Sequence, residues 1–241
     1  MMFLVLLALS FWSCQTTAPP TPRPTTQCAS AAFSSEHIIT TLADSVAFVY
    51  AIDVDGDGDV DVLSASFNDD TVAWYENDGS ESFTERIIST LADNTYSVYA
   101  IDVDGDGDVD ALLASQGDDT VAWYENDGSQ SFTERPIDTY ADGVYSVYAI
   151  DVDGDRDVDV LSASGTDDTV AWYENNGYAS FWERSITTSA NHAVSVYAID
   201  VDNDGDVDVL SASTWDNTVA WSFNRRLLAR DVPRAEQPPF P

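Results

Sequence analysis

Short apolar and aromatic runs, separated by polar turns, recur along most of the chain. The first unit contains four such runs, at residues 46–53, 61–66, 71–76 and 83–90, all rich in Val, Ile, Tyr, Trp and Thr. Such residues suit half-buried strands, and the Asp78-Gly79 pair before the last run is typical of a hairpin turn. No segment has a helical period. The pattern therefore predicts units of four short antiparallel strands and an all-β fold.

This pattern occurs four times at a fixed spacing. The segment AIDVDGDGDVDVLSAS begins at Ala51, and near-copies begin at Ala100, Ala149 and Ala198, so each copy starts 49 residues after the last. One four-stranded sheet buries too little apolar surface to stand alone, and radial stacking of such sheets makes a β-propeller. We therefore expect a β-propeller of four-stranded antiparallel blades, with four repeats of 49 residues.

One tryptophan recurs in the third strand of each repeat, and two interpretations of it stay open. A core position between neighbouring blades is favoured because the surrounding run is almost continuously apolar, as in TVAWY. An aromatic platform for a ligand is the alternative. The four residues are Trp74, Trp123, Trp172 and Trp221.

The ends of the repeat region suggest how the propeller closes. After Trp221 the pattern breaks and no fourth strand follows, whereas residues 36–39 (EHII) match residues 85–88 (ERII). A strand at residues 36–39 would complete the last blade and leave no open sheet edge. We expect a closed four-blade ring; the alternatives are a fragment of a larger ring, or two chains that self-associate because each ring is incomplete.

Five aspartates at alternate positions form an acidic loop in every repeat. Carboxylates about 4 Å apart repel by roughly 4 kcal/mol per pair at an effective dielectric constant of about 20, unless a cation lies between them. Hard oxygen ligands on a flexible loop suit Ca²⁺, with Mg²⁺ second, and the absence of Cys and His from the loops argues against zinc. The predicted metal ligands are Asp53, Asp55, Asp57, Asp59, Asp61, Asp102, Asp104, Asp106, Asp108, Asp110, Asp151, Asp153, Asp155, Asp157, Asp159, Asp200, Asp202, Asp204, Asp206 and Asp208.

The loop is not that of an EF-hand, because strands flank it and its twelfth residue is Ser64 where an EF-hand has glutamate. Instead, VYAIDVDGDGDVDVL resembles the FG-GAP or VCBS-type repeat, also found in the propellers of integrin α-chains. The resemblance covers residues 33–223 and implies one Ca²⁺ per repeat, up to four in all. It implies side-chain oxygens from the first, third, fifth and ninth loop positions, and mainly a backbone carbonyl from the seventh.

The sixth loop position distinguishes the third repeat from the others. Gly58, Gly107 and Gly205 stand at this sharp turn, whereas the third repeat has Arg156. Glycine is favoured where the backbone turns sharply, and arginine also brings a positive charge near the expected ion. We therefore expect the third calcium site to be the weakest.

Charge and the terminal segments bound the function further. The chain has 43 acidic and 9 basic residues, a formal net charge of −34, which opposes binding to nucleic acids. Residues 1–13 are almost wholly apolar at first and read as a signal peptide, with no membrane span expected in the mature protein. Lipid attachment at Cys14 and a mis-assigned start are the alternatives, and pairing of Cys14 with Cys28 stays open. Residues 14–32 form a Thr/Pro-rich linker, residues 33–223 the repeat domain, and residues 224–241 an expected disordered tail.

Three functions compete on this evidence. We expect a secreted or extracellular module that binds a protein or glycan ligand through the loops that vary most between repeats, with Trp215 in the fourth (residues 68–70, 116–118, 165–167 and 214–216). The second is a structural unit of a larger surface assembly, in which Glu85-Arg86 and its copies pair between blades. A calcium-dependent hydrolase or lyase is disfavoured, because the chain has two histidines, His37 and His192, and no nucleophile motif.

Overall fold

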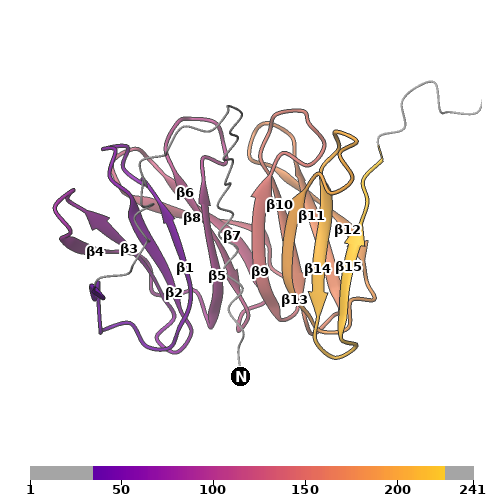
Figure 1. Cartoon of the computed structure of the whole chain (residues 1–241), viewed down its shortest axis with the longest axis horizontal. Helices are drawn as coiled ribbons and strands as arrows, with labels where there is room; N and C mark the ends of the chain where they lie inside the picture. The colour runs from indigo at the N-terminus through magenta and orange to yellow at the C-terminus, as the bar shows by residue number, and fades with distance from the viewer. Residues whose placement is uncertain (1–34, 226–241) are drawn as a thin grey trace, which may run out of the picture. The chain divides into compact units, whose positions relative to one another are not determined.

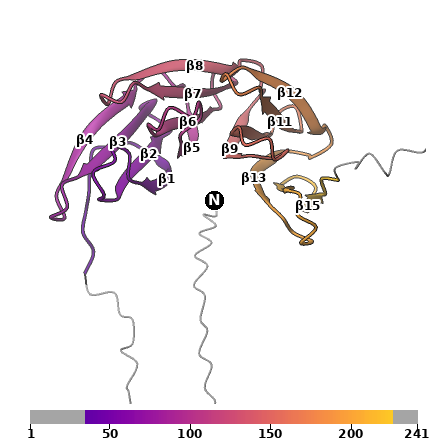
Figure 2. The ribbon, with the colours of Figure 1, turned by 90° about the horizontal axis from the view of Figure 1, so that it is seen from above.

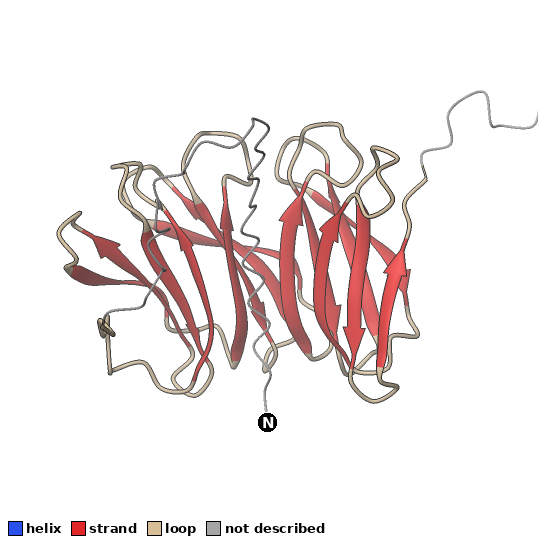
Figure 3. Ribbon diagram, viewed as in Figure 1, coloured by secondary structure: helices blue, strands red, loops and turns tan. Residues whose placement is uncertain are grey.

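The computed structural model describes residues 35–225 of the chain. Fifteen β-strands and no helix lie in these residues (Figures 1 and 3). All of the strands belong to one compact unit, Ile38–Pro241. The few described residues before that unit, 35–37, have no regular structure. The fold is therefore all-β, as the spacing of apolar runs predicts.

Four antiparallel sheets follow one another along the chain. The first contains β1 (Val46–Ile52), β2 (Asp61–Ser66), β3 (Thr71–Asn77) and β4 (Phe83–Ser89). The second contains β5 (Thr95–Ile101), β6 (Asp110–Ser115), β7 (Thr120–Asn126) and β8 (Phe132–Asp138). The third contains β9 (Val144–Ile150), β10 (Asp159–Ser164), β11 (Thr169–Asn175) and β12 (Phe181–Thr187). The last has three strands, β13 (Ala193–Ile199), β14 (Asp208–Ser213) and β15 (Thr218–Ser222).

The same strand register repeats in every sheet. In the first, Leu63 lies opposite Tyr50 on one side and Trp74 on the other, and Trp74 in turn lies opposite Arg86. Equivalent pairs occur in the second and third sheets. Because side chains alternate between the two faces of a strand, this register assigns each repeated residue to the same face of its sheet.

Apolar layers between neighbouring sheets form the core. The layer between the first and second sheets contains Leu63, Val72 and Trp74 from one side and Val98 and Leu113 from the other. Two further layers, built from equivalent residues, join the second sheet to the third and the third to the last. Figure 2 shows the sheets in this order, with β4, β8 and β12 on the outer side of the unit. This propeller-like stacking explains the near-continuous apolar runs, since both faces of an inner sheet are covered.

The tryptophan prediction is confirmed for the inner interfaces. Trp74 and Trp123 are almost fully buried between sheets and Trp172 packs at the edge of the third core, whereas Trp221 in the last sheet is 44% exposed. Trp221 differs because no following sheet covers it in the described residues. The repeated tryptophan is therefore a packing residue wherever two sheets meet.

The predicted strand at residues 36–39 is not formed. Residues 35–40 have no strand structure, and the last sheet has three strands in the described chain, so a closed ring is not shown. The physical reason is that the stack of sheets is open: the face of the last sheet that carries Val219 is exposed, with Val219 itself at 84%, and no fourth strand lies beside β15 in the described residues. The likeness of residues 36–39 to the fourth strand survives only as a turn, in which Thr40 Oγ1 accepts from the Leu42 amide as Ser89 Oγ accepts from that of Leu91.

Several expectations concern residues that the structure does not describe. The expected signal peptide (1–13) and linker (14–32) lie outside the described residues, as do residues 33–34 of the repeat domain and the tail from residue 226. Within residues 35–225, no helix has the length and apolar character that crossing a bilayer would require.

The repeated tryptophan gives a paired test of the stacking. Trp123→Ala should lower the free energy of unfolding by about 3–5 kcal/mol, because it removes a buried indole from a closed interface. Trp221→Ala should cost about 1 kcal/mol or less, because the same position is half exposed in the last sheet. Chemical denaturation at low protein concentration measures both, and equal losses would contradict the stacking order.

Candidate metal centres

The acidic loops join the first and second strands of each sheet, at the same edge as the hairpins between the third and fourth strands. In the first repeat the loop runs from Asp53 to Val60, and the ninth-position aspartate, Asp61, already begins β2. The strands thus hold both ends of each loop, while its middle is exposed to solvent.

Each repeat brings three carboxylates together in a group able to hold a metal ion. One oxygen from each member lies within 4.8 Å of the others. In the first repeat the members come from loop positions one, three and five; in the other three they come from positions one, three and nine. The groups are Asp53, Asp55 and Asp57; Asp102, Asp104 and Asp110; Asp151, Asp153 and Asp159; and Asp200, Asp202 and Asp208.

The predicted ligand set is therefore only partly gathered. The fifth-position residues Asp106, Asp155 and Asp204 and the ninth-position Asp61 lie outside these groups. The assignment of all twenty aspartates as ligands stays a prediction.

The first aspartate of the loop shapes the backbone around itself. Asp53 Oδ1 accepts from the Gly56 amide at 2.8 Å and Asp53 Oδ2 accepts from the Gly58 amide at 2.9 Å. Asp102 makes the same two bonds in the second repeat, to Gly105 and Gly107. The two carboxylate oxygens of the first aspartate thus hold the loop in a tight curl.

The aspartate at loop position nine connects the loop to the sheet. Asp61 is fully buried, and its carboxylate accepts from the amides of Val54 at 2.9 Å and of Asn77 at 2.8 Å. Its equivalents Asp110, Asp159 and Asp208 are buried and make the same contacts. One side chain therefore joins the start of the loop to the end of the third strand.

Burial makes the charge costly at two of these positions, Asp110 and Asp159. It raises the pKa of Asp110 to about 7 and that of Asp159 to about 6, against the two amide bonds that lower it. A nearby cation favours the charged form of a carboxylate, so an ion in the loop would offset part of this cost.

The aspartate at loop position seven lies in different surroundings. A Cβ on Gly79 would lie 2.4 Å from Asp59 Oδ2, and Gly128 and Gly177 stand equally close to Asp108 and Asp157. The seventh carboxylate therefore lies against the glycine of the adjacent hairpin and outside the three-carboxylate group. This placement agrees with a role for its backbone carbonyl, and it explains why the hairpin needs glycine beyond its positive φ.

One supporting residue was missed by the sequence reasoning. Asn77 ends β3, and its side-chain Nδ2 donates to the carbonyl oxygen of Val60 at 3.0 Å, beside the buried Asp61. Asn126 and Asn175 repeat the contact with Val109 and Val158. The signal was present, since an Asn follows Tyr-Glu in the first three repeats, but Asn is not one of the charged residues from which the ligands were predicted.

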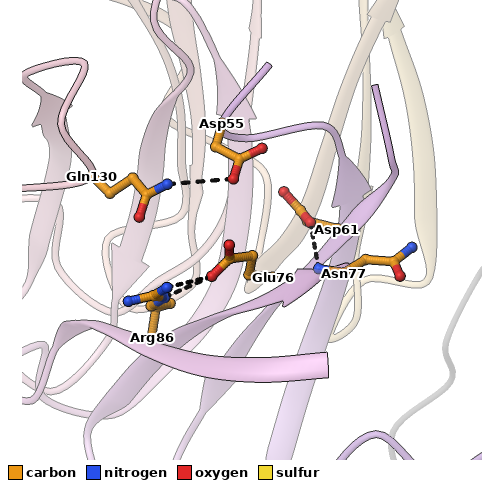
Figure 4. A network of polar contacts seen from close by, with 6 residues as sticks. All are labelled: Asp55, Asp61, Glu76, Asn77, Arg86 and Gln130. Carbon is orange, nitrogen blue, oxygen red and sulfur yellow. Dashed lines mark hydrogen bonds and ion pairs between the residues drawn. The ribbon is translucent and has the colours of Figure 1, made fainter. Parts of the chain in front are cut away.

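Contacts from the neighbouring sheet reach the loop, as Figure 4 shows for the first repeat. Gln130, in the hairpin between β7 and β8, donates from Nε2 to Asp55 Oδ2 at 3.3 Å.

Arg86 donates from Nε to Glu76 Oε2 at 2.8 Å, within one sheet. The idea that Arg86 forms an ion pair between blades is therefore wrong: its register opposite Trp74 places it beside the strand that carries Glu76, and the half-exposed pair contributes little stability.

A cleft of about 550 Å³ opens beside the second loop. Its walls contain Asp104, Trp123, Glu125 and Arg135 from the second sheet, and Gly177 and Tyr178 from a hairpin of the third. The cleft thus lies between two sheets and leaves the second carboxylate group accessible from solvent.

Comparisons with known proteins bear on this repeat. Residues 53–113, 102–162 and 151–211 each match the model of the FG-GAP-like repeat. No curated protein sequence matches the chain. These matches cover the acidic loops and the strands on either side of them.

Among solved structures, the chain is similar to the V. cholerae biofilm matrix protein Bap1, at 18% identity and a TM-score of 0.44, over 76% of this chain and 31% of that one. It is similar to BBS1N in complex with ARL6DN, at 10% identity and a TM-score of 0.48, over 71% and 53%. It is also similar to a protein from Lactobacillus plantarum, at 14% identity and a TM-score of 0.45, over 73% and 56%. The chain therefore spans about a third to just over half of these proteins.

The sixth loop position is a direct test of loop geometry. Arg156 has φ of 85°, in the left-handed region that Gly58, Gly107 and Gly205 also occupy. Arg156→Gly should raise the free energy of unfolding in excess calcium by about 1 kcal/mol, because it removes backbone strain and a positive charge beside the expected ion. Thermal unfolding measures the change.

The reverse substitution in the second repeat is the matched control. Gly107→Arg should lower the unfolding midpoint in calcium, because it introduces the same strain at an unstrained turn. A midpoint that falls for Arg156→Gly, or that is unchanged for Gly107→Arg, would contradict the strain argument.

Proposed function

Since the chain belongs to the FG-GAP-like repeat family, we propose that it is an extracellular calcium-binding repeat protein that binds a protein or glycan ligand. The observation that carries the proposal is the group of three carboxylates, with oxygens within 4.8 Å of one another, that recurs in all four repeats. Unlike a chance surface cluster, it recurs in the same loop and always includes the aspartates at loop positions one and three.

Calcium suits this donor set better than other common ions. The available ligands are carboxylate and backbone oxygens on a turn rich in glycine, which gives the high, flexible coordination that Ca²⁺ accepts. Mg²⁺ demands a stricter octahedron and retains its waters, and Zn²⁺ prefers the nitrogen and sulfur ligands that these loops lack. One ion in each repeat would also compensate part of the net charge of −34.

In this proposal the ion has a structural role. The first aspartate curls the loop and the ninth anchors it to the third strand, so the three-carboxylate group exists only when the sheet is folded. Because the unfolded chain has no preformed site, binding free energy becomes folding free energy, about 2.7 kcal/mol per site at a hundredfold excess over the dissociation constant.

The edge opposite the metal loops is the proposed binding surface. The loops between second and third strands lie there, next to a row of aromatic rings whose neighbouring centroids are 4.5–5.2 Å apart. The row consists of Phe67, Tyr96, Tyr145, His192 and Trp215, and Trp215 at its end is 70% exposed. Exposed aromatic rings beside polar loops suit a protein or glycan ligand.

The proposal assigns no catalytic role to the histidine of this row. His192 packs between Tyr145 and Trp215, and its Nδ1 lies 2.9 Å from Thr214 Oγ1, which fits a packing residue. Secretion of the protein is part of this proposal. A structural unit of a surface assembly is the second candidate, favoured by the uncovered apolar faces of the first and last sheets.

Thermal unfolding with excess calcium and with excess chelator tests the metal proposal. We expect a large rise in the midpoint with calcium. Asp104→Asn should reduce that rise, because it neutralises one oxygen ligand of the second group while keeping the acceptor for the Asp106 amide. Asp142→Asn, the same substitution at an exposed acid outside the loops, is the control and should leave the rise intact. Equal midpoints in calcium and chelator would contradict the proposal.

Binding of the full chain to an immobilised glycan array tests the proposed surface. Trp215→Ala should weaken binding at least about tenfold, because it removes the exposed ring at the end of the aromatic row. Tyr178→Ala is the matched control, since Tyr178 is 89% exposed but lies at the metal-loop edge. Equal binding by both variants and the unmodified protein would exclude Trp215 as a glycan contact.

A further inference from the structure

The first and last sheets each have one face without a neighbouring sheet in the described chain. We call the face that packs on the next sheet in chain order the leading face, and the face that packs on the preceding sheet the trailing face. Leading and trailing faces meet in the three apolar layers inside the molecule. The leading face of the last sheet and the trailing face of the first are therefore the two ends of the stack.

The leading face of the last sheet exposes residues that are buried elsewhere. Val219 is 84% exposed, whereas Val72, Val121 and Val170 at the same repeat position are 0% exposed. Val201 and Ile199 on this face are also exposed. The residues are those of an inner interface, but nothing in the described chain covers them.

The trailing face of the first sheet is uncovered along β1, whereas Ala73 and Tyr75 on β3 of the same face are buried. Val49 is 50% exposed, whereas Val98 at the same repeat position is 0% exposed. Ala51 is exposed while its equivalent Ala100 is buried. Val46 adds further exposed apolar surface on β1.

These two ends carry the surfaces that already fit each other three times. A row of tyrosines crosses the interfaces, with Tyr50, Tyr99, Tyr148 and Tyr197 in contact at centroid distances of 4.7, 5.0 and 4.7 Å. The row ends at Tyr50 on the first sheet and Tyr197 on the last. We propose that two copies of this protein join head to tail, with the leading face of one copy's last sheet packed on the trailing face of the other copy's first sheet.

A second copy is the partner whose surface matches these two faces. Contiguous exposed apolar surface marks an interaction site, and both ends here retain the residues of the repeat interface. The junction is heterologous, since different surfaces meet, so each dimer still has one free face of each kind. Further copies can therefore add until the stack closes or repulsion limits it.

Charge controls when this junction forms. Within the chain, Gln130 donates to Asp55 across the first interface. The equivalent pair at the junction is Glu81 of the second copy and Asp202 of the first, and two carboxylates there repel. Association should therefore be strongest with calcium in the loops, which rests on the proposed function, or in high salt, where the Debye length falls to about 3 Å at 1 M.

Sedimentation velocity of the full chain over a wide concentration range tests the junction, in excess calcium and separately in chelator with high salt. The second condition keeps the test valid if the loops bind no calcium. We expect concentration-dependent dimers and larger species in at least one condition. Val219→Asp and Val49→Asp should each remain monomeric, because each places a charge in one of the two faces. Leu91→Asp, at an 80% exposed position outside both faces, is the control and should associate normally.

Mixing the two variants gives the decisive result. Each retains one intact face, so an equimolar mixture of Val219→Asp and Val49→Asp should form dimers and nothing larger. The proposal would be overturned if the unmodified protein stayed monomeric in both conditions. It would also be overturned if both variants still associated, or if only one of them lost association. Circular dichroism checks folding, and Tyr197→Glu and Ala51→Glu replace a variant that does not fold.

Discussion

The buried aspartate at the start of each second strand joins three parts of the repeat. Asp61 accepts amide protons from the beginning of the acidic loop and from the end of the third strand, within a fully buried site. A buried carboxylate is costly unless it is hydrogen-bonded and paired with positive charge. The two amides supply the first requirement, and a cation in the loop would supply the second. The fold and the proposed metal site thus both depend on this buried loop position.

Packing between sheets explains why the buried aspartate and its acidic loop recur in every repeat. Each sheet is thin and has two apolar faces, so it is stable only between neighbours. The repeat therefore solves two problems with one sequence: it supplies matching faces, and it places an acidic loop at the same edge each time. In the last copy this arrangement leaves apolar surface exposed, because its leading face keeps Val219 and Trp221 but has no sheet to cover them in the described residues.

Much of the fold was predictable because strong local signals agree. The apolar runs, the Asp-Gly hairpins and the strict period place the described strands within one residue of the expected bounds. The strand expected at residues 36–39 was wrong, because similarity to a strand does not put its partner within reach. In the loops, the clustering of the aspartates at positions one and three follows from their spacing. The contact of Asp59 with Gly79 and the bond from Asn77 to Val60 do not, since they depend on how two separate turns meet.

The central claim is that the acidic loops are built to hold calcium. Isothermal titration of calcium into the metal-free chain tests it most directly, because it counts ions as well as measuring affinity. We predict saturable binding of one ion per repeat, with the weakest site in the third repeat, which carries Arg156. Heat changes no larger than dilution, or weak binding without a defined stoichiometry, would show that the loops are solvated acids and would contradict the account.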